Sequence, residues 1–108
     1  MAYFSDQMVN QVWAKGMPVP GIDSNIWRKD FAGAWINRTC YGRTDNKYGW
    51  EIDHLLPEAK GGTDDLTNLN PLQWENNRTK GDNYPEFQTS VTSNGNVNVN
   101  TNKSWRVN

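Results

Sequence analysis

Cysteine and histidine are almost absent from this chain, as are long hydrophobic runs and an excess of either charge. Its 108 residues include one cysteine, Cys40, and one histidine, His54. A single cysteine excludes an intramolecular disulfide and a zinc site built from clustered cysteines. We expect Cys40 to be a small buried residue rather than a reactive one.

No apolar run approaches the ~20 residues that a membrane-spanning helix requires, so we expect a soluble protein without a membrane partner. The first residues show neither the basic nor the apolar region of a secretory signal peptide. A cytoplasmic location is therefore expected, with other export routes left open.

The formal net charge is -1, which provides no general attraction to nucleic acids or anionic lipids. Any binding of a polyanion would have to be local. It would be weak, or it would require basic side chains to gather on one side of the fold. The candidates are Arg28, Lys29, Arg38, Arg43, Arg78, Lys80, Lys103 and Arg106.

The length suits a single domain, residues 1–108, with a modest hydrophobic core. Six tryptophans are unexpectedly many for so short a chain. Large aromatic side chains supply much buried area, so we expect them in the core. The functional alternative is an exposed tryptophan platform that stacks sugars or bases.

The N-terminal part, residues 1–48, is expected to be a helical extension. Apolar residues at helical spacing predict a helix from a Ser5 cap to about Lys15. A second short helix is expected over residues 26–31, and a strand over residues 34–40.

The pattern becomes sharper from residue 49 onward. Alternating polar and apolar residues predict a strand over residues 50–55, followed by a long loop whose tight point is Gly61–Gly62. Residues 69–73 predict a second strand, and residues 74–80 a helix that stops at Gly81. The order is strand, loop, strand, helix.

The C-terminal segment, residues 88–108, is rich in asparagine. Asparagines alternate with other residues around Val97 and Val99. This pattern leaves two alternatives, an edge strand or a flexible, disordered tail.

Residues that carry chemistry lie in and after the first of the two strands. Asp53 and His54 point to opposite faces of a regular strand, unless it bends. A helix after the hairpin could bring Asn77 beside Asp53. Carboxylate and amide oxygens are hard donors, which suits Mg²⁺, with Mn²⁺ as an alternative and zinc disfavoured.

The segment 49–82 resembles the motif of HNH endonucleases, the ββα-metal or His-Me finger class. It combines an Asp-His pair, Gly61–Gly62, an Asn-Leu step at Asn68 and the ending Asn-Arg-x-Lys-Gly. The resemblance implies an α+β fold with a small ββα-metal core of hairpin plus helix. Additional N-terminal helices would complete that fold.

The resemblance also implies roles for individual residues. His54 would be the general base that activates water. Asp53 and Asn77 would hold one divalent ion, and Asn68 would hold the loop and help to orient the histidine. An imidazole with an ordinary pKa near ~6.5 suits the role of base at neutral pH.

Two basic residues, Arg78 and Lys80, match positions of the family that face phosphate. Glu51 lies on the same face as Asp53 if the strand is regular, so we expect it as an outer-shell partner of the ion. An ordinary exposed strand residue is the alternative for Glu51.

The chain departs from the family pattern in two ways. Asn77 replaces the third histidine, which makes this an HNN variant. The cysteine pairs that hold a structural zinc in many members are missing, so we expect no structural zinc in this chain.

The resemblance implies a metal-dependent endonuclease that hydrolyses phosphodiester bonds in DNA and leaves 5′ phosphate and 3′ hydroxyl ends. RNA is left open as a substrate. The first alternative is a catalytically inactive HNH-fold module that binds nucleic acid. The second is a carbohydrate- or protein-binding domain that uses exposed tryptophans.

Overall fold

The computed structural model describes residues 3–108, and within them the strands form three separate antiparallel pairs, β1–β2, β3–β4 and β5–β6. In chain order the elements are α1 (Asp6–Trp13), β1 (Trp27–Lys29), β2 (Trp35–Asn37), β3 (Trp50–His54), β4 (Leu69–Gln73), α2 (Trp74–Lys80), β5 (Glu86–Asn94) and β6 (Val97–Arg106). The architecture is therefore α+β, as expected.

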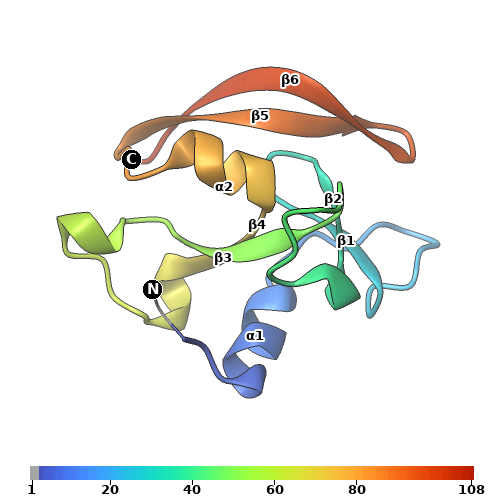
Figure 1. The fold of residues 1–108 in the computed structure, drawn as a ribbon, viewed down its shortest axis with the longest axis horizontal. Helices are drawn as coiled ribbons and strands as arrows, with labels where there is room; N and C mark the ends of the chain where they lie inside the picture. Colours follow the sequence, from blue (N-terminus) through green and yellow to red (C-terminus); the bar gives the residue numbers. More distant parts are fainter. Residues whose placement is uncertain (1–2) are drawn as a thin grey trace.

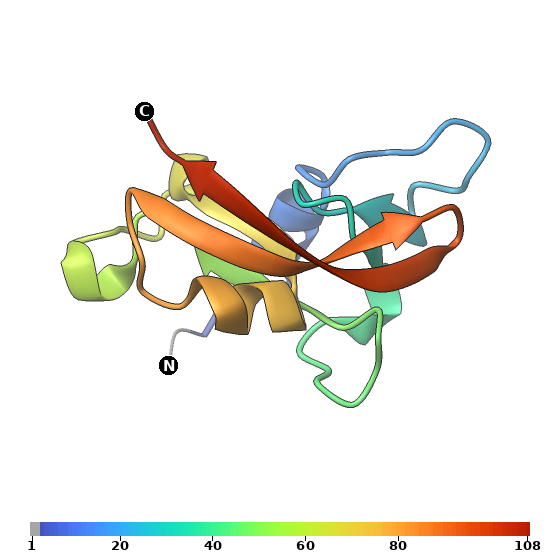
Figure 2. The ribbon, with the colours of Figure 1, turned by 90° about the horizontal axis from the view of Figure 1, so that it is seen from above.

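The elements are stacked in layers (Figure 1). The β5–β6 hairpin covers α2, α2 lies on the β3–β4 hairpin, and α1 packs beneath β4. Seen from above, the twisted β5–β6 ribbon spans the molecule, and its turn lies beside β2 (Figure 2). The Trp35 indole N–H in β2 donates to the Gly95 carbonyl in that turn at 2.7 Å. The β3–β4–α2 unit thus lies in the middle of the fold.

Helix α1 begins as predicted, because the Ser5 hydroxyl accepts a hydrogen bond from the Met8 N–H at 3.1 Å. It ends at Trp13, two residues earlier than expected. Its buried face joins β2, β3 and β4 in the main core. The buried members of that core are Val9, Val12, Trp13, Ile36, Trp50, Ile52 and Leu69.

The central hairpin and its helix agree closely with the sequence prediction. β3 ends at His54, one residue before the expected end, while β4 and α2 have the expected bounds. The Gln73 side chain caps α2 by accepting hydrogen bonds from the N–H groups of Glu75 and Asn76. Gly81, at φ 54°, ends the helix. The local signals were sufficient here.

The loop between β3 and β4 closes tightly at Gly62. A Cβ atom at this position would lie 1.7 Å from the Leu56 carbonyl oxygen, so a side chain there would force the backbone apart. The Gly62 N–H also donates to the Pro57 carbonyl at 2.9 Å. The predicted tight point is therefore a close approach of two backbone segments.

The prediction of a helix over residues 26–31 was wrong, so of the additional N-terminal helices the structure contains α1 but not the second. Residues Trp27–Lys29 form β1, which pairs with β2 in the register Arg28↔Ile36. Trp27 also packs edge-on against Tyr48 at 5.0 Å between ring centroids. These partners are distant in sequence, and their contacts override the weak local helix signal.

The asparagine-rich C-terminal segment forms strands rather than a tail without structure. The burial that holds it lies on β5, where Phe87, Thr89 and Val91 alternate toward the interior. The Asn98 side chain on β6 also binds the β2 backbone, accepting from Trp35 N–H at 2.7 Å and donating to Trp35 carbonyl at 3.0 Å. A buried face on one strand and a side-chain anchor on the other dock the hairpin.

The tryptophans serve mainly as packing residues. Trp13, Trp35 and Trp50 are buried, and Trp13 meets Trp50 at 5.3 Å between ring centroids. The other tryptophans are half-buried, which disfavours an exposed stacking platform. Cys40 is buried as expected. Within residues 3–108, no helix has the length and apolar character needed to cross a membrane.

Candidate active site

A small cavity collects three of the residues expected to carry chemistry. Asp53 and His54 at the end of β3 and Asn77 on α2 line a cavity of about 140 Å³. Glu58 and Asp82 line it as well. Although consecutive strand residues point to opposite faces, Asp53 and His54 reach the same cavity, because β3 ends at His54 and the chain turns there.

Asp53 is held from inside the protein by Lys80. The Lys80 ammonium lies 3.1 Å from Asp53 Oδ1, and both side chains are buried, with 0% and 3% of their surface exposed. The same ammonium donates to the carbonyls of His54 and Leu55 at 3.1 and 3.2 Å. Burial raises the pKa of Asp53, and the positive charge of Lys80 opposes that shift.

This position corrects the expected role of Lys80. We expected its ammonium to face phosphate, but the side chain lies wholly inside the fold and has three oxygen partners there. A buried carboxylate is costly without a cation beside it. Lys80 therefore serves Asp53 and the end of β3.

One oxygen of Asp53 has no hydrogen-bond partner. Among the described residues, the buried side-chain polar atoms without one are Asp53 Oδ2 and the Trp50 indole nitrogen. Buried polar atoms are nearly always satisfied, so an orphaned carboxylate oxygen beside a cavity requires an explanation. A hard divalent cation is a suitable partner for such an oxygen.

Asn77 and Arg78 both contact Glu51, the expected outer-shell residue. The Asn77 Nδ2 group donates to Glu51 Oε1 at 3.1 Å, which leaves the amide oxygen free of that bond. The Arg78 guanidinium lies 3.5 Å from Glu51 Oε2, and 61% of the Arg78 side chain is exposed. Glu51 thus orients one neighbour of the cavity, while Arg78 extends into solvent.

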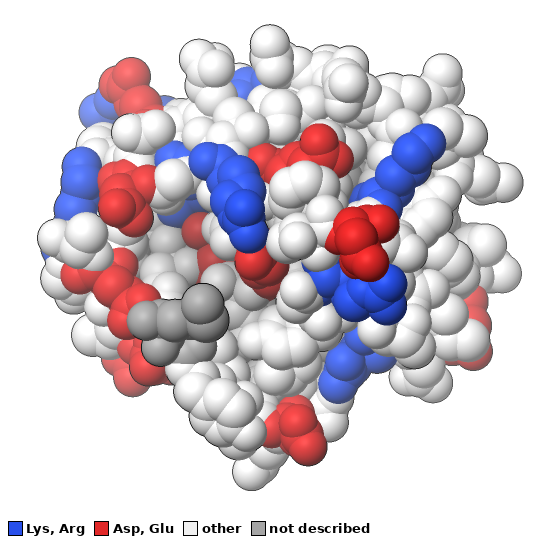
Figure 3. All heavy atoms as spheres, in the orientation of Figure 1, with Lys and Arg blue, Asp and Glu red and all other residues white. Residues whose placement is uncertain are grey.

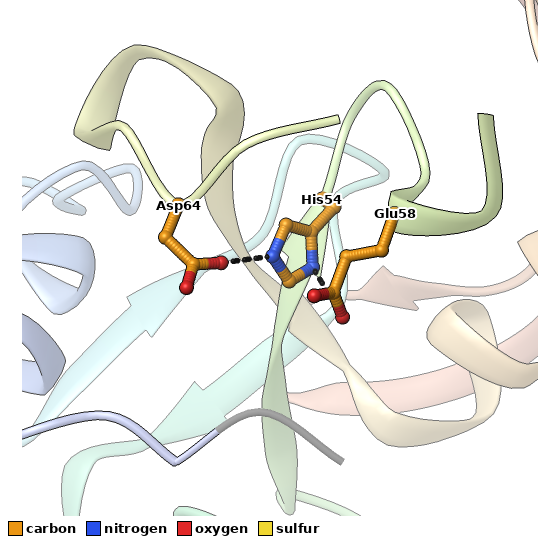
Figure 4. A group of neighbouring side chains, drawn as sticks. All are labelled: His54, Glu58 and Asp64. Carbon is orange, nitrogen blue, oxygen red and sulfur yellow. Dashed lines mark hydrogen bonds and ion pairs between the residues drawn. The ribbon is translucent and has the colours of Figure 1, made fainter. Parts of the chain in front are cut away.

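The ring of His54 lies between two carboxylates that the sequence reasoning did not single out (Figure 4). Asp64 Oδ1 is 2.7 Å from Nε2, and Glu58 Oε1 is 3.9 Å from Nδ1. One ligand atom from each of these three residues lies within 4.8 Å of the others. The four-residue spacing from His54 to Glu58 was the available signal, whereas the approach of Asp64 depends on the loop.

The Asn68 side chain forms hydrogen bonds within that loop, and none of those that the structure describes is to His54. Its Oδ1 accepts from the Leu56 N–H at 2.9 Å, and its Nδ2 donates to the carbonyls of Leu56 and Thr63 at 3.1 and 2.9 Å. It therefore ties the start of the loop to the segment that carries Asp64.

Basic side chains are distributed among acidic ones on the face shown in Figure 3. Several of the expected DNA-contacting residues have partners within the protein. The Arg43 guanidinium lies 2.8 Å from an Asp45 carboxylate oxygen, and Arg106 pairs with Glu86. Such pairing reduces the positive charge available for phosphate contacts.

A hairpin and helix that bring a histidine, a carboxylate and an amide to one cavity define a class of site suited to hydrolysis with a divalent ion. Residues 38–83 match the family model described as HNH endonuclease, which supports the resemblance of this part of the chain to that family. No curated protein and no solved structure matches the chain. At the family level, the match supports a nuclease or nucleic-acid-binding function.

Proposed function

We propose that the protein is a metal-dependent endonuclease that hydrolyses phosphodiester bonds in DNA. His54 is the general base, and Asp53 and Asn77 hold one divalent ion. The observation that carries the proposal is the buried, unpartnered Asp53 Oδ2 in a residue that lines the same cavity as His54 and Asn77. This donor set favours Mg²⁺, with Mn²⁺ as the next choice.

In the proposed reaction, His54 accepts a proton from the water that attacks phosphorus. The bond from phosphorus to the 3′ oxygen breaks, and the leaving oxygen takes a proton from a solvent water molecule, which gives a 5′ phosphate and a 3′ hydroxyl. A bound divalent ion supplies electrostatic stabilisation of the charge that develops on the phosphate. Lys80 favours the ionised form of Asp53, and exposed Arg78 is the proposed phosphate contact.

The test is conversion of supercoiled plasmid to nicked and linear forms with Mg²⁺, Mn²⁺ or EDTA. We expect metal-dependent cutting that EDTA abolishes. His54→Ala should slow it by about 10²- to 10⁴-fold, the usual contribution of a general base. Circular dichroism and a gel-shift assay with the variant check that the fold and DNA binding survive.

A wild-type protein that binds metal and DNA but cuts neither duplex nor single-stranded DNA contradicts the endonuclease proposal. That outcome favours the inactive nucleic-acid-binding module. A His54→Ala variant that cuts at the parental rate removes His54 as the base.

A further inference from the structure

The two ring nitrogens of His54 have different surroundings. Nε2 is within hydrogen-bond distance of Asp64, at 2.7 Å, whereas the nearest Glu58 oxygen is 3.9 Å from Nδ1, too far for a direct hydrogen bond (Figure 4). A carboxylate only accepts hydrogen bonds, so Nε2 must carry the proton that bonds to Asp64. In the neutral ring, Nδ1 is then the nitrogen with a free lone pair.

The two carboxylates beside the ring also differ in their relation to the cavity. Glu58, on the Nδ1 side at 3.9 Å, lines the cavity together with His54, Asp53 and Asn77, whereas Asp64, on the Nε2 side, is not one of its lining residues. The bond to Asp64 is therefore made through the nitrogen that the proposed reaction does not use.

Other contacts hold the ring and its partner in place. Phe4 packs on His54 with 5.9 Å between the ring centroids. Thr63, next to Asp64 in the chain, is held by the Asn68 amide at 2.9 Å. Gly62 permits the close backbone contact that brings this segment back toward β3.

We propose that Asp64 is the positioning residue for His54: by accepting the Nε2 proton, it selects the tautomer in which Nδ1 is the general base. The catalytic part rests on the proposed function. Asn68 acts through the loop that presents Asp64, rather than by a contact with the ring. Asp64 itself stays outside the reaction.

The first test reads the tautomer directly. His54 is the only histidine in the chain, so a long-range ¹H–¹⁵N spectrum of the labelled protein contains a single imidazole. At alkaline pH, where imidazole is neutral, we expect the wild type to show a protonated Nε2 and an unprotonated Nδ1. Asp64→Ala should give a mixture of tautomers. Asp64→Asn should also lose the wild-type preference, because its amide N–H can donate to an unprotonated Nε2.

Asp65→Ala is the matched control. Asp65 is the adjacent loop carboxylate, and its side chain accepts a hydrogen bond from the Thr63 hydroxyl at 3.0 Å instead of contacting His54. This variant should keep the wild-type tautomer. The same spectrum in Asp64→Ala and the wild type, or a wild type with its proton on Nδ1, overturns the inference.

The second test is kinetic. For plasmid nicking, Asp64→Ala should lower kcat at least 10-fold with KM unchanged, and Asp64→Asn should not recover the loss, because its amide can hold the other tautomer. A parental kcat in Asp64→Ala overturns the positioning role. If the wild type does not cut but Asp64→Ala loses the tautomer preference, the proposed function fails while the selection of the tautomer by Asp64 stands.

Discussion

Helix α2 carries two consecutive asparagines that belong to polar clusters of opposite character. Asn76 is buried, and its side chain makes four hydrogen bonds, to Asp30, to the Val91 carbonyl and to the N–H groups of Ser90 and Val91. Asn77 bonds to Glu51 and lines the cavity. One position on the helix serves the fold, and the next serves the candidate site.

The carboxylates of the two clusters show the same contrast. Both oxygens of Asp30 accept hydrogen bonds, from Ala34 N–H and from Gln73 N–H and Asn76 Nδ2, at 2.8 to 3.0 Å. Asp53 Oδ1 pairs with the Lys80 ammonium, whereas Asp53 Oδ2 has no hydrogen-bond partner. A carboxylate whose two oxygens both have hydrogen-bond partners has no oxygen left for a ligand. Asp53, with one unpartnered oxygen beside a cavity, can bind one.

The strongest way to break this comparison is Lys80→Met. Removal of the ammonium leaves the buried Asp53 carboxylate without its cation, which we expect to cost about 3–5 kcal/mol of unfolding free energy. Urea unfolding measures the loss. Arg78→Met is the matched control on the same helix, since its exposed charge should change stability by less than about 0.5 kcal/mol. A stable Lys80→Met protein with weakened DNA binding would instead restore the phosphate-facing role.

The next prediction compares the two asparagines directly. Asn76→Ala leaves several buried partners unsatisfied and should cost about 3 kcal/mol, while Asn77→Ala should cost less than about 1 kcal/mol. The effects on metal binding should be reversed, with Mn²⁺ affinity lost in Asn77→Ala. Chemical unfolding and titration calorimetry measure both quantities. Equal destabilisation by the two variants, or full Mn²⁺ affinity in Asn77→Ala, would remove the distinction between the clusters.

Segments with strong local signals were predictable from the sequence. Alternation over β3 and β4, and Gly81 after α2, define the central hairpin and helix almost to the residue. The motif likewise indicated that Asp53, His54 and Asn77 belong together, and the cavity contains all three. In the hairpin and the helix, neighbours in sequence carry the relevant physics, whereas the meeting of Asn77 with Asp53 was implied by the family resemblance.

Features that depend on distant partners were not predictable. Asp30 reaches Gln73 and Asn76 across 43 and 46 residues of chain. The burial of Lys80 depends on the β5–β6 hairpin, because its ammonium lies 5.2 Å from the Phe87 ring centroid. The pairing of Asp64 with His54 depends on the loop closure at Gly62. Composition and periodicity contain no information on such pairings.

The pH dependence of stability tests the comparison of the two polar clusters through Asp30. Burial raises the pKa of Asp30 above its ordinary value, and its hydrogen bonds only partly offset that shift. The folded state therefore holds the proton more tightly than the unfolded state. The stability that comes from tighter proton binding by Asp30 in the folded state is complete below the ordinary pKa of 3.8. It is lost as pH rises through the pKa of Asp30 in the folded state.

The test is the unfolding free energy of the wild type relative to Asp30→Asn, from pH 4 to pH 7. The wild type should lose stability relative to the variant as pH rises, by about 1.4 kcal/mol for each pKa unit between the folded and unfolded states. A difference that does not change with pH would mean that burial does not raise the pKa of Asp30.

The smallest expected effect concerns the outward-facing cation of α2. Arg78 is 61% exposed, and its contact with Glu51 at 3.5 Å is a surface ion pair. Because exposed ion pairs contribute little, Arg78→Ala should leave stability almost unchanged. If its guanidinium contacts one phosphate, the slope of log K for DNA against log salt should become shallower by about 0.9. Arg43→Ala is the control, because Asp45 already pairs with that charge, and its slope should match the wild type. Equal slopes in both variants would mean that Arg78 does not contact DNA. The buried Lys80 and the exposed Arg78 would then differ in burial but not in phosphate binding.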